Sequence, residues 1–320
     1  MKRNSFLLLL CCLQFAAMSQ SPFAGDSTLM AFASDTQKPM WVETLFLKSN
    51  QNRQATKKIF DEFSQLKPRA LFLLGDVVNL GYSNKQWKDM SGYLKNLRKE
   101  GIEVHAALGN HEVMGKAKKG ENKFQTYFPE HVRTGYVKVV DSVAVILLNS
   151  NFGKLGTAEN QAQISWYKKT LKELDNNPSI EYIISGCHHS PFTNSKVVGC
   201  SKGVEDMFVQ PFLLSKKSRL FLSGHSHNFE QYQVKGKDFL VIGGGGGLHQ
   251  PLKTGEGLLD DIASDYKPEF HYLTVKRCAE GLQIKSYQLT KDFSTFEEGR
   301  NMVILRDKAP RTDIASSGSN

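Results

Sequence analysis

The feature that most constrains the fold of this chain is a series of five apolar runs, each followed at once by metal-binding types of side chain. The five runs are Leu29–Ala33, Ala70–Leu74, Glu103–Leu108, Tyr182–Ser185 and Arg219–Ser223. The polar blocks that follow them are Ser34–Gln37, Gly75–Asp76, Gly109–Glu112, His188–Pro191 and Gly224–His227. Runs of this length, bounded by turn residues, are typical of buried strands in a parallel sheet. Since ligand sites in open α/β sheets lie beyond the carboxyl ends of the strands, we expect the blocks to meet in one cleft as a metal centre.

Amphipathic helices are predicted between these strands. Apolar residues recur at helical spacing in Ala55–Leu66, Trp87–Leu97 and Ile164–Leu174. The segment Tyr136–Leu148 predicts a hairpin, and Phe239–Leu289 predicts further short strands around glycine clusters. Strands that alternate with helices and then continue as strands predict an α/β fold, with two sheets packed face to face and helices outside, in one domain.

Both ends of the chain are expected to lie outside this domain. Lys2 and Arg3 precede an apolar segment, and a small-x-small pattern at Ala17–Ser19 predicts that residues 1–19 are a secretory signal peptide. A membrane anchor and lipidation at Cys11 are the alternatives. We therefore expect a secreted or periplasmic protein with no integral membrane association after cleavage. The folded domain is expected to span 28–300, and the polar residues 307–320 to form a disordered tail.

Charge content restricts the possible binding partners only coarsely, and cysteine content leaves the disulfide state open. The chain has 41 basic and 32 acidic residues, a net charge of +9, which favours anionic substrates without selecting one. The basic residues are scattered, and the short cluster Lys116–Lys119 predicts solvated surface, so no nucleic-acid partner is expected. Cys187, Cys200 and Cys278 remain after signal cleavage, and a Cys187–Cys200 bridge and three buried thiols both stay open.

The residue types in the blocks suit a centre of two ions. The Asp76 carboxylate has two oxygens and can bridge two ions, while Asn110 offers a neutral amide oxygen. His225 and His227 can reach different ions from one loop, and His189 adds a further imidazole. Two ions roughly 3.5–4 Å apart can hold both the attacking and the departing oxygen of an in-line displacement at phosphorus.

The blocks, taken in this order, resemble the calcineurin-like metallophosphoesterase superfamily, which shares D-x-H, G-D, G-N-H-[DE], a His before Pro, and G-H-x-H. Within it, His189–Ser195, Gly224–Glu230 and Gly243–Gly247 resemble the purple acid phosphatase branch. The resemblance covers roughly residues 28–290. It implies a four-layer αββα sandwich of two packed mixed sheets, with a dinuclear metal site at the carboxyl ends of the strands.

The resemblance also implies a role for each matching residue. The first ion would be held by Asp35, Asp76 and His227, and the second by Asp76, Asn110, His189 and His225. His111 would face the substrate, place the phosphoryl group and protonate the leaving oxygen, and Glu112 would orient the His111 imidazole. The ions would be two divalent or trivalent transition metals, with Mn, Fe and Zn equally suited to these ligands.

Three positions depart from the family pattern. Gln37 stands where most of the superfamily has a ligating His, and both ligation through its amide oxygen and a hydrogen-bonding role stay open. Asn79 replaces the metal-bound Tyr of purple acid phosphatases, so no purple colour is expected. His188 precedes His189 and is either a substrate contact or merely a neighbour, because the spacing to Pro191 favours His189 as the ligand.

The remaining histidines are expected to be structural or superficial. His105 is interpreted as a core residue, while His131 and His271 are interpreted as surface or structural residues. His249 follows the glycine run and is a candidate for the cleft wall. The run Gly243–Gly247 lacks the Lys-Ser/Thr of a P-loop and predicts close backbone packing near the site.

The implied function is that of an exported, metal-dependent phosphoesterase that hydrolyses phosphomonoesters by attack of a metal-bound hydroxide. Its partner would be a small phosphorylated substrate. The nearest alternative is a phosphodiesterase with the same dinuclear centre. A protein that binds metal and phosphorylated ligands without turnover is a second alternative, permitted by Gln37 and Asn79, and hydrolysis of a non-phosphate ester is a third.

Overall fold

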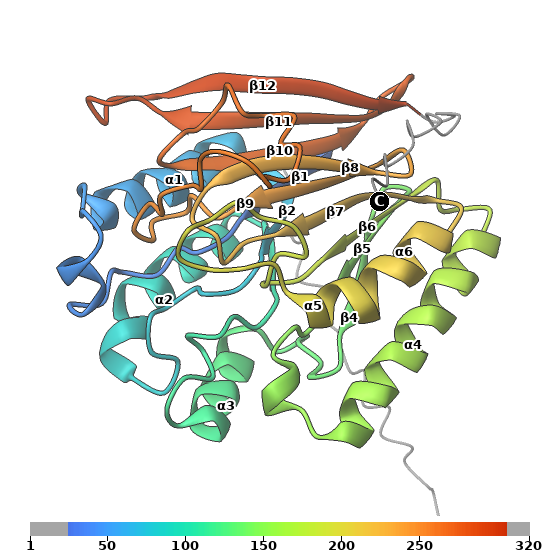
Figure 1. Ribbon diagram of the computed structural model, residues 1–320, viewed down its shortest axis with the longest axis horizontal. Coiled ribbons are helices and arrows are strands. Elements are labelled where there is room, and N and C mark those ends of the chain that lie inside the picture. The colour runs from blue at the N-terminus through green and yellow to red at the C-terminus, as the bar shows by residue number, and fades with distance from the viewer. Residues whose placement is uncertain (1–24, 306–320) are drawn as a thin grey trace, which may run out of the picture.

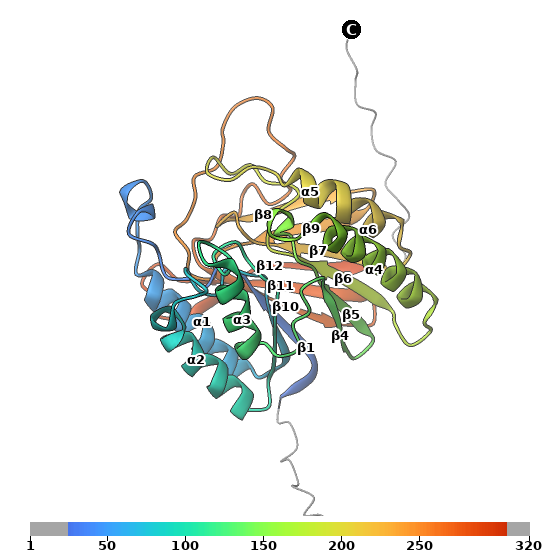
Figure 2. The ribbon, with the colours of Figure 1, turned by 90° about the horizontal axis from the view of Figure 1, so that it is seen from below.

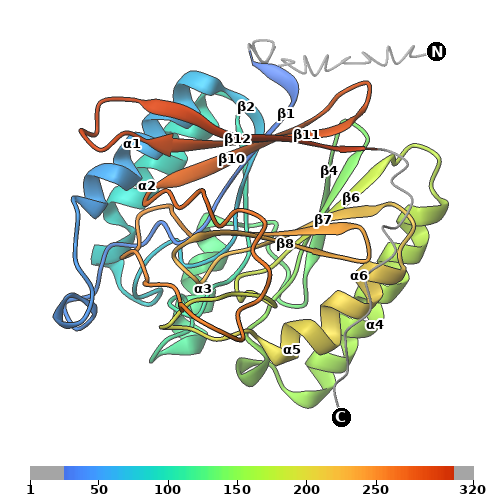
Figure 3. The ribbon, with the colours of Figure 1, turned by 45° about the horizontal axis from the view of Figure 1, so that its top comes forward.

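The computed structural model describes residues 25–305, which form two six-stranded sheets with helices on their outer faces (Figure 1). The first sheet has the order β12 (Phe296–Leu305), β11 (Gly281–Leu289), β10 (His271–Arg277), β1 (Asp26–Ala33), β2 (Pro68–Leu73) and β3 (Glu103–Ala106). The second has the order β4 (Tyr136–Val140), β5 (Val143–Leu147), β6 (Tyr182–Gly186), β7 (Ser218–Ser223), β9 (Lys237–Ile242) and β8 (Phe229–Val234). Figure 3 shows the sheets as separate layers.

Both sheets are mixed, with parallel strands where the site-bearing loops begin. Strands β1, β2 and β3 pair in parallel, as do β5, β6, β7 and β9. The antiparallel strands β10, β11 and β12 extend the first sheet, while β4 and β8 are the edge strands of the second. The strands expected before the five polar blocks are thus all present, and so is the hairpin β4–β5.

The side chains of the central strands alternate between two cores. Met30 and Phe32 of β1 face the other sheet and join Ile184 of β6 in the core between the sheets. Ala31 and Ala33 face the opposite way, into a core shared with the helices. Because strand side chains alternate between faces, one apolar run can fill both cores, and this explains why β1 is apolar throughout its buried half.

Helices cover the outer face of each sheet, which completes four layers (Figure 2). Against the first sheet pack α1 (Asn52–Leu66), α2 (Asn84–Lys99) and α3 (Ala117–Tyr127), and against the second pack α4 (Thr157–Asn176), α5 (Lys202–Val204) and α6 (Gln210–Leu214). Short turns η1 (Glu43–Leu45) and η2 (Phe152–Lys154) are 3₁₀-helical, and η3 (Glu205–Val209) is a π-helix. The four-layer αββα sandwich expected from the resemblance is therefore confirmed. No helix within residues 25–305 has the length and apolarity needed to cross a bilayer.

Two helical segments were not predicted from the sequence. The cluster Lys116–Lys119 is exposed, as expected, but it also opens α3, which buries Phe124 against Trp87. The second segment runs without interruption through α5, η3 and α6 despite Pro211 in its interior. Proline removes a backbone donor from a helix and interrupts its i→i−4 hydrogen bonds. The π-turn just before Pro211 changes the hydrogen-bond spacing there, so that the helix continues through the proline.

The three described cysteines are free thiols, so the predicted Cys187–Cys200 bridge is wrong. The alternative of three buried thiols is also wrong, because Cys200 is exposed and Cys278 is half-buried. Burial raises the pKa of the Cys187 thiol, which favours its protonated form. The predicted signal peptide and the predicted tail lie outside the described residues, and the described fold runs from Asp26 to Leu305.

Candidate metal centre

The five polar blocks meet at the carboxyl ends of the strands that precede them, β1, β2 and β3 of one sheet and β6 and β7 of the other. The Asp35 N–H donates to the Gly75 carbonyl at 3.1 Å, which ties the first block to the second. The Gly224 N–H donates to the His188 carbonyl at 2.9 Å, which ties the fifth block to the fourth. The His225 N–H in turn donates to the Asp35 carboxylate at 3.0 Å and so joins the two sheets. The convergence expected from strand order alone is therefore present, with the blocks after β1, β2 and β3 facing those after β6 and β7.

Three site residues adopt a left-handed backbone. The φ angles of Asp35, Asp76 and His225 are 60°, 49° and 67°. Residues with a side chain rarely adopt positive φ, although Asp and His tolerate it better than most, and each such position costs of order 1–3 kcal/mol. All three lie two or three residues beyond a strand end, where the chain turns sharply and aims the side chain at the site.

Glycine is required beside these residues because the backbones lie too close for a side chain. A Cβ on Gly224 would lie 2.3 Å from an oxygen of the Asp35 carboxylate and 1.9 Å from the Ser34 hydroxyl. A Cβ on Gly247 would lie 2.5 Å from Cε1 of His227. The run Gly243–Gly247 therefore packs its backbone directly against the site, as the sequence predicted.

Asp76 is the buried carboxylate on which the site is centred. Its Oδ1 accepts the His111 N–H at 2.9 Å, and its Oδ2 lies 3.1 Å from Nε2 of His188 and 3.7 Å from Nε2 of His111. Burial alone would raise the pKa of Asp76, but the charges of His188 and His111 outweigh it and hold the pKa far below its usual range. The lowered pKa favours the ionised carboxylate, which can bind a cation through each of its two oxygens.

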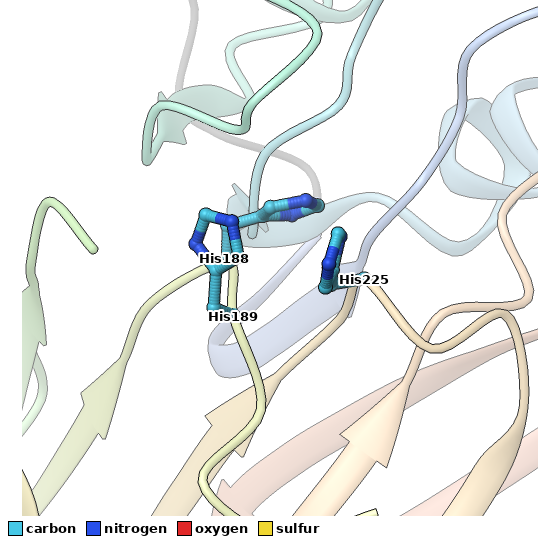
Figure 4. A group of neighbouring side chains, drawn as sticks. All are labelled: His188, His189 and His225. Atoms are coloured by element: carbon cyan, nitrogen blue, oxygen red, sulfur yellow. The ribbon is translucent and has the colours of Figure 1, made fainter. Parts of the chain in front are cut away.

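Figure 4 shows three imidazoles, those of His188, His189 and His225, gathered together in the site. One ring nitrogen from each of His188, His189 and His225 lies within 4.8 Å of the other two. Burial and the neighbouring His188 lower the pKa of His189 to about 3 and that of His225 well below its ordinary value. Burial opposes the charging of His188 too, but Asp76 raises its pKa to about 9. Two neutral imidazoles and one that shares a proton with a carboxylate therefore meet at one point.

Backbone carbonyls hold the outer nitrogens of two site histidines, His188 and His227. Nδ1 of His188 lies 3.0 Å from the Leu74 carbonyl, and Nδ1 of His227 lies 2.6 Å from the Leu248 carbonyl. A carbonyl only accepts hydrogen bonds, so Nδ1 carries the proton and Nε2 points into the site. Ser150 contacts His189 in a similar way, with its hydroxyl 2.7 Å from Nδ1.

Gln37 lies beside His227, at the position where the resemblance places the first ion. Both ends of its amide are satisfied when the nitrogen donates to the backbone carbonyls of Asp35 and Asp76, at 3.0 and 2.8 Å. The amide oxygen then faces Nε2 of His227, which also lies 3.3 Å from Oδ1 of Asp35. Gln37 is therefore anchored by its nitrogen and presents its oxygen to the site.

His111 lies beside Asp76, and its other neighbours, the Asn79 carbonyl and Glu43, were not predicted from the sequence. Its Nδ1 lies 3.0 Å from the Asn79 carbonyl, and its Nε2 lies 4.0 Å from a carboxylate oxygen of Glu43. Burial opposes its charging, but Asp76 and the Asn79 carbonyl raise the pKa of His111 overall. Sequence reasoning missed Glu43, because it lies in the short 3₁₀ turn η1, which shows no strand or helix periodicity in the sequence.

Glu112 does not orient His111 through a hydrogen bond. Its buried carboxylate accepts the N–H groups of Asp76, Val78 and Gly109 at 2.8–3.0 Å, so it positions the second and third blocks relative to each other. The expected contact with the imidazole is therefore corrected: the Asn79 carbonyl holds the ring. Burial and the nearby Asp76 raise the pKa of Glu112 to about 7.

The other expected residues lie as follows. Oδ1 of Asn110 lies 2.9 Å from Nε2 of His188, at the mouth of the site. His249 borders a separate cavity of about 750 Å³ with Asn50 and Lys267. The three remaining histidines, His105, His131 and His271, are buried, so the surface alternative for the last two is wrong.

The donor set fits metal ions on chemical grounds. Two buried carboxylates, Asp35 and Asp76, lie among the imidazoles of the site, and the group Asp35, Asp76 and His188 presents ligand-type atoms within 4.8 Å of one another. Among residues 25–305, this group and the three-imidazole group are the ones that meet this criterion, and they share His188. Buried charge of this density is otherwise costly, which favours a cation between these groups.

Comparisons with known proteins agree with this geometry. Residues 29–229, more than half of the chain, match the family model described as calcineurin-like phosphoesterase. Among solved structures, a purple acid phosphatase from yellow lupin (Lupinus luteus) superposes with a TM-score of 0.63 at 15% identity, over 92% of this chain and 58% of that one. The chain thus spans little more than half the length of that structure.

Two further structures share the fold. GAP50 of Plasmodium, described as the anchor in the inner membrane complex, superposes with a TM-score of 0.61 at 13% identity, over 89% of this chain and 90% of that one. A dimetal phosphatase from Danio rerio gives 0.52 at 12% identity, over 88% and 99%. No curated protein matches the sequence. The family match and the site together show that the chain belongs to the calcineurin-like phosphoesterase family.

Proposed function

We propose that this protein is an exported, metal-dependent phosphoesterase that acts on phosphomonoesters. The observation that carries the proposal is the position of Asp76, an ionised carboxylate with ligand-type groups on two sides and the His111 ring 3.7 Å away. Family membership supports phosphoester hydrolysis as the reaction class. Export is proposed from residues 1–19 of the sequence alone.

Two ions would be held on either side of Asp76. Asp35, Gln37 and His227 would complete the first position, and Asn110, His189 and His225 the second. When bound, such ions supply positive charge for the phosphoryl oxygens and lower the pKa of a coordinated water towards about 7. The left-handed backbones at Asp35, Asp76 and His225 fix the donors before any ion arrives, which reduces the reorganisation that binding requires.

His111 is the group best placed to act on the substrate directly. Its Nδ1 is held by the Asn79 carbonyl, so Nε2 faces the site and carries a proton when the ring is charged. Because Asp76 raises the pKa of His111 against the effect of burial, the charged ring persists to higher pH than a free imidazole would. A proton at Nε2 can hydrogen-bond a phosphoryl oxygen and then pass to the departing oxygen of the ester.

Two structural neighbours define the alternatives to test. The lupin and zebrafish proteins are described as phosphatases, whereas GAP50 is described as an anchor, so the fold by itself does not decide whether a chain is catalytic. Gln37 is the observation that favours the binding-protein alternative, since it removes an imidazole from the first ion position. The retained donors Asp76, His189 and His225 favour the enzyme.

The test is hydrolysis of 4-nitrophenyl phosphate and bis(4-nitrophenyl) phosphate by the purified chain, after chelation and after reloading with Mn, Fe or Zn. We expect turnover that chelation abolishes and metal restores, with the monoester hydrolysed faster. Asp76→Asn should remove both metal and turnover, whereas Asp89→Asn, which changes a surface carboxylate paired with Lys38, should change neither. Faster hydrolysis of the diester would make the chain a phosphodiesterase, and two bound ions without any turnover would favour the binding protein.

A further inference from the structure

His188 lies at the centre of the site although the chain spacing assigns ligation to its neighbour. Its side chain is fully buried. Nε2 lies 3.1 Å from Oδ2 of Asp76 and 2.9 Å from Oδ1 of Asn110. These two oxygens are the ones expected at the second ion position, so the His188 nitrogen points at the same place as they do.

The orientation of the His188 ring is fixed from behind. Nδ1 hydrogen-bonds the carbonyl of Leu74, at the end of the loop that leads to Asp76. This arrangement, in which the outer nitrogen donates to a carbonyl and the inner nitrogen faces a cluster of donors, is the usual one for a metal-binding histidine. His189, held by Ser150, and His225, on the neighbouring loop after β7, direct their rings to the same point, with ring centroids 5.0 Å from that of His188.

The two ion positions therefore differ in chemistry. Around the second position stand three imidazoles, those of His188, His189 and His225, whose nitrogens lie within 4.8 Å of one another. Around the first stand the carboxylate of Asp35, the amide oxygen of Gln37 and a single imidazole, that of His227. Imidazole-rich sets favour zinc and other late first-row metals, whereas oxygen-rich sets favour manganese and magnesium.

We infer that His188 is an additional ligand of the second ion, and that the centre is consequently asymmetric, with one nitrogen-rich position that retains its ion and one oxygen-rich position that exchanges it. The inference rests on the proposed metal centre and deepens it. On this assignment the first position has one imidazole, that of His227, and the second has three.

The inference is tested by metal binding to the full chain, without reference to turnover. Metal-free protein is titrated with zinc chloride and, separately, with manganese chloride against a chromophoric chelator. We expect two zinc equivalents in two steps that differ by about tenfold or more in affinity, and weaker manganese binding at the tight step. X-ray absorption at the zinc edge, with one equivalent bound, should report three imidazoles.

Two variants separate the positions. His188→Asn should weaken the tight zinc step by about tenfold or more and leave the weak step. Gln37→His should strengthen the weak step and leave the tight one. His131→Asn is the matched control, because it also removes a buried neutral imidazole but lies against Phe124 and Tyr136, and it should change neither step.

Each result decides the inference. A zinc affinity of His188→Asn equal to or higher than that of the wild type would overturn the inference. His188 would then lie next to the ion position without binding the ion, or would occupy that position itself. If His188→Asn fails to fold by circular dichroism, the zinc-edge spectrum of the wild type decides, and two imidazoles would overturn the inference. Two-step binding without phosphoester turnover would instead refute the proposed function and leave the inference standing.

Discussion

At the scale of single residues, the proposed function divides the side chains of this site between holding metal and handling protons. Asp76 is shared by both tasks, because one of its oxygens accepts the His111 N–H while the other faces His188 and the His111 ring. His111 itself is held by a backbone carbonyl and has a raised pKa. This separation makes it possible to remove proton transfer without removing the ions.

His111→Asn should retain two equivalents of metal and lower kcat by about 10²–10⁴-fold, since the loss of a general acid typically costs that much. Metal content by elemental analysis and kcat on 4-nitrophenyl phosphate provide the measurement. His131→Asn is again the control, with an unchanged rate. An unchanged kcat in His111→Asn would show that the ring does not take part in the reaction.

The convergence of the blocks was predictable from the sequence, for a simple reason. Asp35, Asp76, Asn110, His189, His225 and His227 all follow strand ends, and parallel strands of a sheet end at one edge. The sequence did not reveal the central place of His188, because ring orientation depends on the Leu74 carbonyl, 114 residues away. It also misplaced the contacts of Glu112, whose partners are backbone N–H groups and therefore leave no trace in side-chain patterns.

At the scale of elements, the ends of β2 and β7 each combine a glycine with a donor of positive φ, Gly75 with Asp76 and Gly224 with His225. Gly224 is in contact with the Asp35 carboxylate from the opposite sheet, so the loop after β7 and the loop after β1 fit together only without a Cβ. The same close packing is repeated by the glycine run after β9 against His227.

Gly224→Ala should lower the free energy of unfolding by about 1–3 kcal/mol, as overpacking of a tight site does, and should weaken metal binding because Asp35 must move. Chemical denaturation and zinc titration measure the two effects. The matched control is Gly153→Ala, where a Cβ would meet nothing within 4 Å. Wild-type stability together with wild-type metal affinity in Gly224→Ala would contradict the contact.

Helices with regular apolar stripes were predictable, and irregular ones were not. The stripe of α1 buries Ala55, Ile59 and Phe63 as the spacing predicted. In 202–214, Gly203 and Pro211 obscure the helical pattern, and only packing of Phe208 and Phe212 in the outer core of the second sheet maintains the helix. Whether such segments form helices depends on their tertiary contacts and not on local helix propensity.

At the scale of the whole molecule, buried neutral histidines outside the site make the fold sensitive to acid. Burial lowers the pKa of His131 to about 4 and that of His271 to about 3, from an ordinary value of 6.5. A lowered pKa in the folded state means that the unfolded chain binds protons first as the pH falls. The stability that these rings contribute is therefore complete above pH 6.5 and is lost as the pH falls towards their folded values.

The metal-free protein should consequently lose stability between pH 6.5 and about 4, by up to about 3 kcal/mol for His131 alone. Melting temperature as a function of pH measures this. His131→Gln should flatten the decline, because glutamine does not titrate, whereas a variant of an exposed lysine such as Lys119→Gln should not. An equally steep decline in His131→Gln would assign the acid sensitivity to other groups.

The placement of the site between the two sheets has a consequence for how the molecule holds together. Asp35, Asp76 and Asn110 belong to the first sheet, while His188, His189, His225 and His227 belong to the second. An ion coordinated by both groups is a cross-link between halves that otherwise adhere through apolar side chains and a few hydrogen bonds. Resistance to shear, to proteolysis and to heat would then follow the supply of metal, with about 2.7 kcal/mol gained at a free ion concentration one hundred times the Kd. In an environment poor in metal, the lifetime of the chain would shorten together with its activity.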